Sequence, residues 1–142
     1  AKGLRVNPGG RLRYVSTALV ERIDLPPDAA SVREARSFVT DRLAHWGCEA
    51  VSELAALLTS ELATNVVLHA HTPYAVVLTR TLGGARIDVL DKSDDAPALQ
   101  GHDIAAPTGR GLAIVACMAS QWGATPPEEL VGFAKGVRFS VG

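Results

Sequence analysis

The chain has 142 residues, a length that fits one domain with a sizeable core. Its 47% hydrophobic and 20% charged residues are ordinary for a soluble globular protein. The formal net charge of −1 gives no reason to expect a nucleic acid partner, because that binding needs a basic surface. No apolar run approaches the roughly 20 residues that span a bilayer, and no signal-peptide pattern opens the chain, so we expect a cytoplasmic protein without membrane contact.

The two cysteines and the N-terminal segment carry little functional signal. Cys48 and Cys117 lack CxxC spacing, so we expect free, buried thiols rather than a metal site. Residues 1–13 are rich in Gly, Arg and Pro and show no periodicity. They predict a disordered leader, which leaves residues 14–142 as the folded domain.

A strand and two helices are predicted next. Residues 17–25 alternate loosely between polar and apolar side chains and predict a strand. After two prolines, Asp28 can cap a helix that runs to about Trp46 with one apolar stripe, and Gly47 ends it. Residues 50–70 form a second predicted helix, rich in Leu and Ala.

The central segment predicts a β-hairpin followed by a long loop. Residues 74–82 have a β-branched bias, the glycine pair at 83–84 is a turn signal, and residues 85–90 are the partner strand. Residues 91–109 carry Asp, Ser, Pro and Gly with little periodicity and predict a long loop. A helix is then expected over about residues 111–120.

Three short strands are predicted to close the chain, over residues 122–124, 130–134 and 136–141. The order of the elements predicts an α+β fold. We expect a two-layer α/β sandwich in which an antiparallel-rich mixed sheet is covered on one face by helices.

The second predicted helix carries polar side chains on an otherwise apolar segment. Glu61, Asn65 and His69 are four residues apart, so in an α-helix they project from one side. A buried carboxylate and carboxamide need partners. A hydrated magnesium ion beside a nucleotide would satisfy both, with Asn65 as an oxygen ligand and Glu61 as acceptor of a hydroxyl proton. The alternative, that these residues cap loops or face solvent, stays open on this pattern alone.

Two further signals follow the hairpin. Asp91 comes directly after a strand, where its carboxylate can accept a hydrogen bond from an exocyclic amine such as that of adenine, although turn aspartates are common there. The run Thr108-Gly109-Arg110-Gly111-Leu112 opens an apolar helix. The free N-terminal amides of this helix can bind phosphate. The alternative is that the two glycines form only a flexible hinge before the helix. The sequence holds neither a Walker A loop nor a Rossmann fingerprint.

Taken in order, these signals resemble the boxes of the GHKL ATPases. A Glu-x-x-x-Asn pair on a helix, an Asp after a strand and a Gly-x-Gly before a helix occur in that order over about residues 17–141. The strings Ser-Glu-Leu-Ala-Thr-Asn-x-x-x-His-Ala and Gly-Arg-Gly-Leu-x-x-Val look most like the bacterial anti-sigma-factor serine/threonine protein kinases. The resemblance implies the Bergerat α/β sandwich, which binds ATP and Mg²⁺ between its helices and a loop.

The resemblance also implies a role for each matched residue. Glu61 matches the general base, Asn65 the magnesium ligand and Asp91 the adenine-binding acid. The other residues that the resemblance places near the nucleotide are His69, Ser93, Gly109, Arg110, Gly111 and Leu112.

The implied activity is phosphoryl transfer from ATP to a serine of an anti-sigma antagonist protein. A sigma factor is a further candidate partner, and a homodimer and a place in a larger signalling protein stay open. Ser93 stands where the family often has Gly, and Gly136-Val137 where it often has Gly-Thr. These departures keep a rival open: a non-catalytic switch that binds ATP, or nothing, and sequesters a partner by its helical face.

Overall fold

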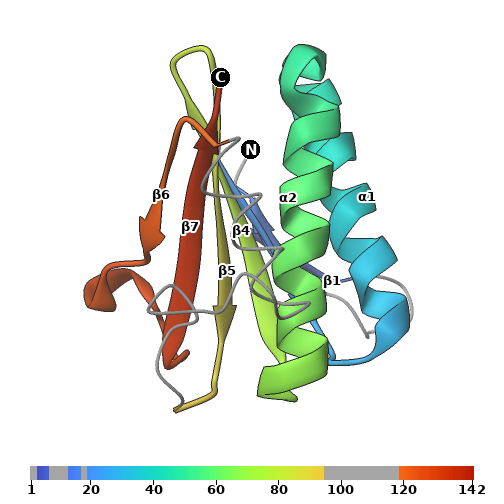
Figure 1. Ribbon diagram of the computed structural model, residues 1–142. Coiled ribbons are helices and arrows are strands. Elements are labelled where there is room, and N and C mark those ends of the chain that lie inside the picture. The colour runs from blue at the N-terminus through green and yellow to red at the C-terminus, as the bar shows by residue number, and fades with distance from the viewer. Residues whose placement is uncertain (1–2, 7–12, 17–18, 95–118) are drawn as a thin grey trace.

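The computed structural model describes residues 3–6, 13–16, 19–94 and 119–142. They form a two-layer α/β sandwich, in which two helices cover one face of a seven-stranded sheet (Figure 1). The strand order is β1-β2-β3-β4-β5-β7-β6, and every pairing among these strands is antiparallel rather than mixed. The elements are β1 (Gly3–Val6), β2 (Arg13–Ser16), β3 (Val20–Leu25), α1 (Ala29–His45), α2 (Ser52–Asn65), β4 (Tyr74–Thr81), β5 (Gly84–Asp91), β6 (Gln121–Ala124) and β7 (Lys135–Val141). The expected α+β sandwich is therefore confirmed.

The N-terminal segment departs from the expected disordered leader. Gly3–Val6 forms strand β1 and pairs with β2, with Gly3 opposite Ser16. Pairing needs only backbone donors and acceptors, so a short segment can join a sheet without an alternating side-chain pattern. The prediction of a disordered leader over 1–13 is wrong for these four residues and for Arg13, which begins β2.

Helix α1 begins and ends where the sequence indicates. The side chain of Asp28 accepts a hydrogen bond from the Ser31 amide at 3.0 Å, which caps the first turn. At the other end Gly47 takes φ 73°, a left-handed conformation that glycine adopts without strain. The adjoining Cys48 is a free, half-buried thiol.

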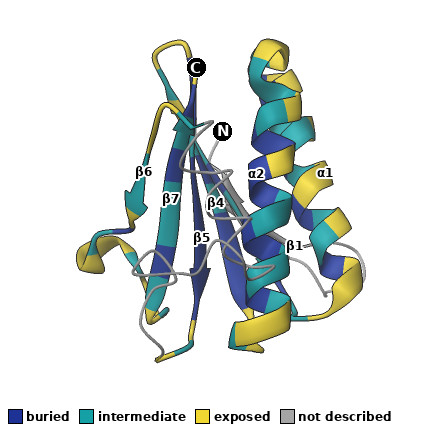
Figure 2. Ribbon diagram, in the orientation of Figure 1, coloured by how far each residue is buried: buried dark blue, intermediate teal, exposed yellow. Residues whose placement is uncertain are grey.

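Helix α2 is extended by a tighter helical turn at its start and by a wider one at its end. A 3₁₀ turn (Glu49–Val51) precedes it, and a π-turn (Val66–Ala70) follows it. By length and composition alone, the whole stretch Glu49–Ala70 could cross a membrane, contrary to the expectation from the sequence. Core helices meet the same criterion, and here the buried side of the stretch packs against the sheet and α1 (Figure 2). Of the apolar window in this stretch, 39% is buried inside the fold.

The β4–β5 hairpin turns one residue earlier than expected. Thr81 pairs with Gly84, so the turn residues are Leu82 and Gly83, and Gly83 takes φ 82°. Gly84 already belongs to β5, where a Cβ would collide with the carbonyl of Val141. Both glycines are required, but only the first makes the turn.

The C-terminal strands β6 and β7 match two of the three predicted ones. The strand predicted over 130–134 is wrong, because Val131 and Gly132 take φ 44° and 88° and turn the chain after a 3₁₀ turn (Pro127–Glu129). The helix predicted over about 111–120 and most of the predicted loop lie outside the described residues, as does Cys117.

The open face of the sheet, opposite the helices, holds an ion-pair network around Asp88. Arg138 Nε donates to Asp88 Oδ1 at 2.7 Å, and the hydroxyl of Thr125 donates to the same oxygen at 2.8 Å. Arg138 also donates to Glu129, and this bond holds the pKa of the Glu129 carboxyl below its usual value. The network fastens the segment between β6 and β7 to the sheet. Gly136 lies beneath it, where a Cβ would come within 2.6 Å of the Thr125 hydroxyl oxygen.

Tyr74 links β4 to the start of α1. Its ring is fully buried, and its hydroxyl lies 2.6 Å from the Ser31 hydroxyl. Burial raises the pKa of Tyr74 above its ordinary value of 10.0. A tyrosine with a raised folded-state pKa contributes stability below about pH 10 and loses it as the pH rises from there toward the folded pKa.

We therefore expect the parent protein to lose stability above about pH 10, and Tyr74→Phe to lose less of it. At neutral pH the variant should be about 1 kcal/mol less stable, because the contact with Ser31 is gone. Urea unfolding of both proteins at pH 7 and above pH 10 measures their free energies of unfolding. An equal alkaline loss of stability in the two proteins would show that Tyr74 is not its source.

Candidate functional site

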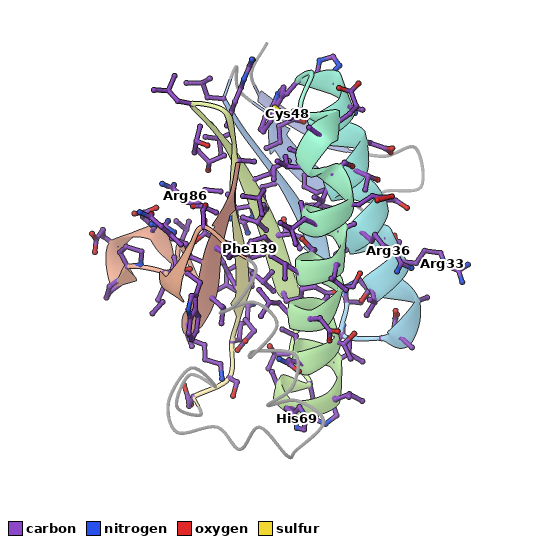
Figure 3. All side chains as sticks on the ribbon, turned by 45° about the horizontal axis from the view of Figure 1, so that its top comes forward. Arg33, Arg36, Cys48, His69, Arg86 and Phe139 are labelled. Atoms are coloured by element: carbon purple, nitrogen blue, oxygen red, sulfur yellow. The ribbon has the colours of Figure 1, made fainter. Side chains whose placement is uncertain are left out.

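The C-terminal end of α2 and the C-terminal end of β5 lie at the same end of the sandwich. The backbone amide of Lys92 donates to the hydroxyl of Thr72 at 2.9 Å, which ties the residue after β5 to the segment that leaves α2. Figure 3 shows His69 at this end of the helix. The end of β5 that carries Asp91 and the C-terminal end of α2 therefore lie at the same edge of the sandwich.

Asp91 occupies the end of β5 between β4 and β7, with Tyr74 and Lys135 directly opposite. Directly opposed residues share a face, and Tyr74 reaches Ser31 of α1, so Asp91 lies on the helix-covered face. Its side chain is only 6% exposed. Asp91 Oδ1 accepts a hydrogen bond from the Ser93 amide at 2.8 Å, which orients the carboxylate.

Glu61 and Asn65 lie one turn apart on regular α-helix, both half-buried. No hydrogen bond or ion pair joins either side chain to another residue in the described part of the chain. They therefore do not cap any loop that the structure describes. A carboxylate and a carboxamide placed together and left open to a ligand are what a site for a hydroxyl and a metal ion needs.

His69 is placed differently from the two residues before it. Residues 66–70 form a π-turn, closed by the bond from the His71 amide to the Val66 carbonyl at 2.9 Å, so α-helical spacing does not hold beyond Asn65. His69 is exposed at the end of the helix. The expectation that it continues the Glu61–Asn65 face with α-helical geometry is wrong for this reason. His71, which follows, takes the left-handed conformation at φ 56°.

The predicted phosphate-binding run at 109–112 lies outside the described residues. Ser93 follows β5 and is half-buried, and its amide is engaged by Asp91. Val137, the other departure from the family pattern, lies on the helix-covered face of β7 and packs against the core. A threonine there would add a hydroxyl to that face, beside the buried Val89.

The residues present fit a magnesium ion that is held mainly by phosphate. Among the residues that the structure describes, no three His, Cys, Asp or Glu side chains are grouped as a metal cage. Mg²⁺ keeps several waters and is usually bound through one or two protein oxygens together with substrate phosphates. One carboxamide, from Asn65, is a donor set of that kind.

Two residues of this edge were not predicted from the sequence. Lys135 lies opposite Asp91 across the β5–β7 pair, and Thr72 holds the backbone after Asp91. Neither stands in a recognisable pattern, because their placement follows from strand register and from the path of the chain after the π-turn. Only the three-dimensional fold brings them to the site.

The fold is an antiparallel sheet under two helices, with the carboxamide of Asn65 on α2 and the buried Asp91 at the end of β5. The family model of the histidine kinase-like ATPase domain matches residues 25–128, which is more than half of the chain. The chain belongs to this family. Among curated proteins, none matches the chain with significant similarity. The match includes Glu61, Asn65 and Asp91.

We expect Asn65→Ala to weaken magnesium-ATP binding by about tenfold while changing folding stability little. The half-buried carboxamide has no described partner whose loss would destabilise the fold. Asn65→Asp, which keeps a ligand oxygen, is the matched control and should retain magnesium-dependent binding better than the alanine variant. Calorimetric titration of each protein with ATP, with and without Mg²⁺, measures the binding affinity. Unchanged affinity in folded Asn65→Ala would rule out Asn65 as the magnesium ligand.

Proposed function

We propose that the chain is an ATP-dependent serine/threonine protein kinase of the anti-sigma-factor type. Its protein substrate would be a serine of an anti-sigma antagonist. Family membership supports ATP binding in a regulatory domain. The observation that carries the kinase assignment is Glu61: a half-buried carboxylate, without a partner in the described residues, one helical turn before Asn65.

Each residue of the edge would do one task. Asp91, whose orientation is held by Ser93, would accept a hydrogen bond from the adenine amine. Asn65 would hold magnesium through its carbonyl oxygen. The ion, when bound, supplies positive charge that stabilises the phosphate oxygens. Glu61 would orient the serine hydroxyl and accept its proton as the serine oxygen bonds to the γ-phosphorus and the bond to the ADP oxygen breaks.

A non-catalytic switch is the second candidate. Ser93 and Val137 replace the glycine and threonine that the family often has, and the bulkier or less polar side chains favour weaker nucleotide binding. In that case the chain would bind ATP or nothing and sequester a protein through its helices.

The partners and location follow from the same proposal. An antagonist protein and a sigma factor are the candidate partners, and a homodimer would be compatible with both. The modest net charge gives no support for nucleic acid. The packing of the apolar stretch Glu49–Ala70 into the core supports a cytoplasmic protein rather than a membrane-spanning one.

Single-turnover phosphorylation with labelled ATP and a small anti-sigma antagonist protein tests the proposal. We expect magnesium-dependent transfer to a serine of the antagonist. ATP binding without transfer to any antagonist would favour the switch. Failure to bind ATP in a calorimetric titration would contradict the kinase and leave only the nucleotide-free form of the switch.

A further inference from the structure

A cavity of about 280 Å³ lies between the α1–α2 connection and the β4–β5 hairpin. This is the end of the sandwich away from the candidate functional site, and Figure 3 shows Cys48 and His69 at these opposite ends. Both segments contribute lining residues, which include Trp46, Cys48, Val51, Arg80, Thr81 and Gly83. The proposed kinase function makes no use of this cavity.

Arg80 gives the cavity its charge. Side chains alternate along a strand, and Tyr74 of β4 faces α1, so Arg80, six residues later on β4, also lies on the helix-covered face. The arginines of β3, β5 and β7 all pair with carboxylates, namely Arg22 with Asp24, and Arg86 and Arg138 with Asp88. The Arg80 guanidinium has no such partner among the described residues, and none of the residues that line the cavity is acidic. The cavity therefore offers a cation to an anion from outside the chain.

Trp46 gives the cavity an aromatic wall. It is the C-terminal cap of α1 and is only 9% exposed. The half-buried Cys48 thiol donates to the Trp46 carbonyl at 3.7 Å, which holds this part of the connection. A planar ligand can pack its ring against an indole while its carboxylate pairs with a guanidinium. Cavities of about 300–1,000 Å³ hold drug-sized ligands, so a slightly smaller one fits a ligand with a single ring.

We propose that this cavity is a binding site for a small aromatic carboxylate. The carboxylate pairs with Arg80, and the ring packs against Trp46 beside Cys48. The cavity is at the other end of the sandwich from Asn65 and Asp91, so a nucleotide and the carboxylate can be bound at the same time. The inference holds whether the chain is a kinase or a switch.

Protection of Cys48 from alkylation tests the site, with benzoate as the probe. Iodoacetamide modifies the thiol, and mass spectrometry of the peptide that contains Cys48 gives the rate of modification. We expect benzoate to slow this modification with a Kd of about 1 mM, a value in keeping with a ligand of few atoms. Benzamide has nearly the same shape but no charge, and its Kd should be about tenfold higher. Saturating magnesium-ATP should leave the protection by benzoate unchanged.

Arg80→Gln removes the charge from the cavity and should raise the Kd for benzoate by about tenfold. The variant should fold, because Arg80 is exposed and its side chain has no described partner to lose. Arg33→Gln is the matched control, since Arg33 is an exposed arginine near the start of α1, away from the cavity. That control should keep the Kd of the parent protein.

The proposal is overturned by a rate of Cys48 alkylation that benzoate does not change, even far above the expected Kd. Equal protection by benzamide overturns it as well, and this comparison on the parent protein does not depend on how the variants fold. Protection that survives in Arg80→Gln would show that the arginine does not hold the carboxylate. Loss of the protection in saturating magnesium-ATP would show that the two ligands share one site, which contradicts the placement at the far end.

Discussion

Glu61→Gln is expected to abolish most phosphoryl transfer while leaving ATP binding intact. Glutamine keeps the shape of the side chain and removes the proton acceptor, so transfer to a partner serine should fall by about 10²–10⁴-fold. Phosphoryl transfer has a loose transition state in which positioning carries much of the catalysis, which favours the lower end of this range. The fold should tolerate the change, since the Glu61 carboxylate has no hydrogen-bond or ion-pair partner among the described residues.

The measurement is single-turnover transfer from labelled ATP at matched nucleotide saturation. Glu53→Gln is the matched control, because Glu53 is exposed on the same helix, two turns before Glu61. The control should transfer phosphate at the parent rate. If Glu61→Gln lowers transfer only in proportion to its folded fraction, Glu61 is structural and the general-base assignment is wrong.

The elements fixed by local chemistry were predictable from the sequence. Asp28 caps α1 through a bond to a residue three positions away, and Gly47 ends the helix by its own backbone conformation. Glu61 and Asn65 were predictable together for the same reason, since helical spacing alone brings them to one side. In each case the residues that determine the feature lie within about one helical turn of each other.

Features that depend on distant partners were not predictable. Strand β1 exists because β2 offers it a hydrogen-bonded edge, and nothing in its Gly-Leu-Arg-Val sequence indicates that pairing. The link between Tyr74 and Ser31 spans 43 residues, and Lys135 lies opposite Asp91 only through strand register. The π-turn after Asn65 has no sequence signal either, and it is what separates His69 from the predicted face. The roles of Glu61, Asn65 and Asp91 remain predictions that the variants address.

Asp91 should control both the strength and the base selectivity of nucleotide binding. Its buried carboxylate suits the exocyclic amine of adenine, which donates, and opposes the carbonyl oxygen that guanine has at that position. The parent should therefore bind ATP more tightly than GTP. Asp91→Asn keeps an oxygen that can accept the Ser93 amide bond, so the loop after β5 should hold its path.

The Asp91→Asn variant is then expected to bind ATP about tenfold more weakly and to discriminate less against GTP. It loses the charge that strengthens the adenine bond, and its amide group can donate to guanine. Asp88→Asn is the matched control: Asp88 lies on the same strand but on the open face, where it pairs with Arg138. That control should lower the free energy of unfolding and leave the ATP-to-GTP affinity ratio unchanged. Calorimetric titration of the three proteins with both nucleotides measures these affinities. Equal affinity of the parent for ATP and GTP would contradict the assignment of adenine recognition to Asp91.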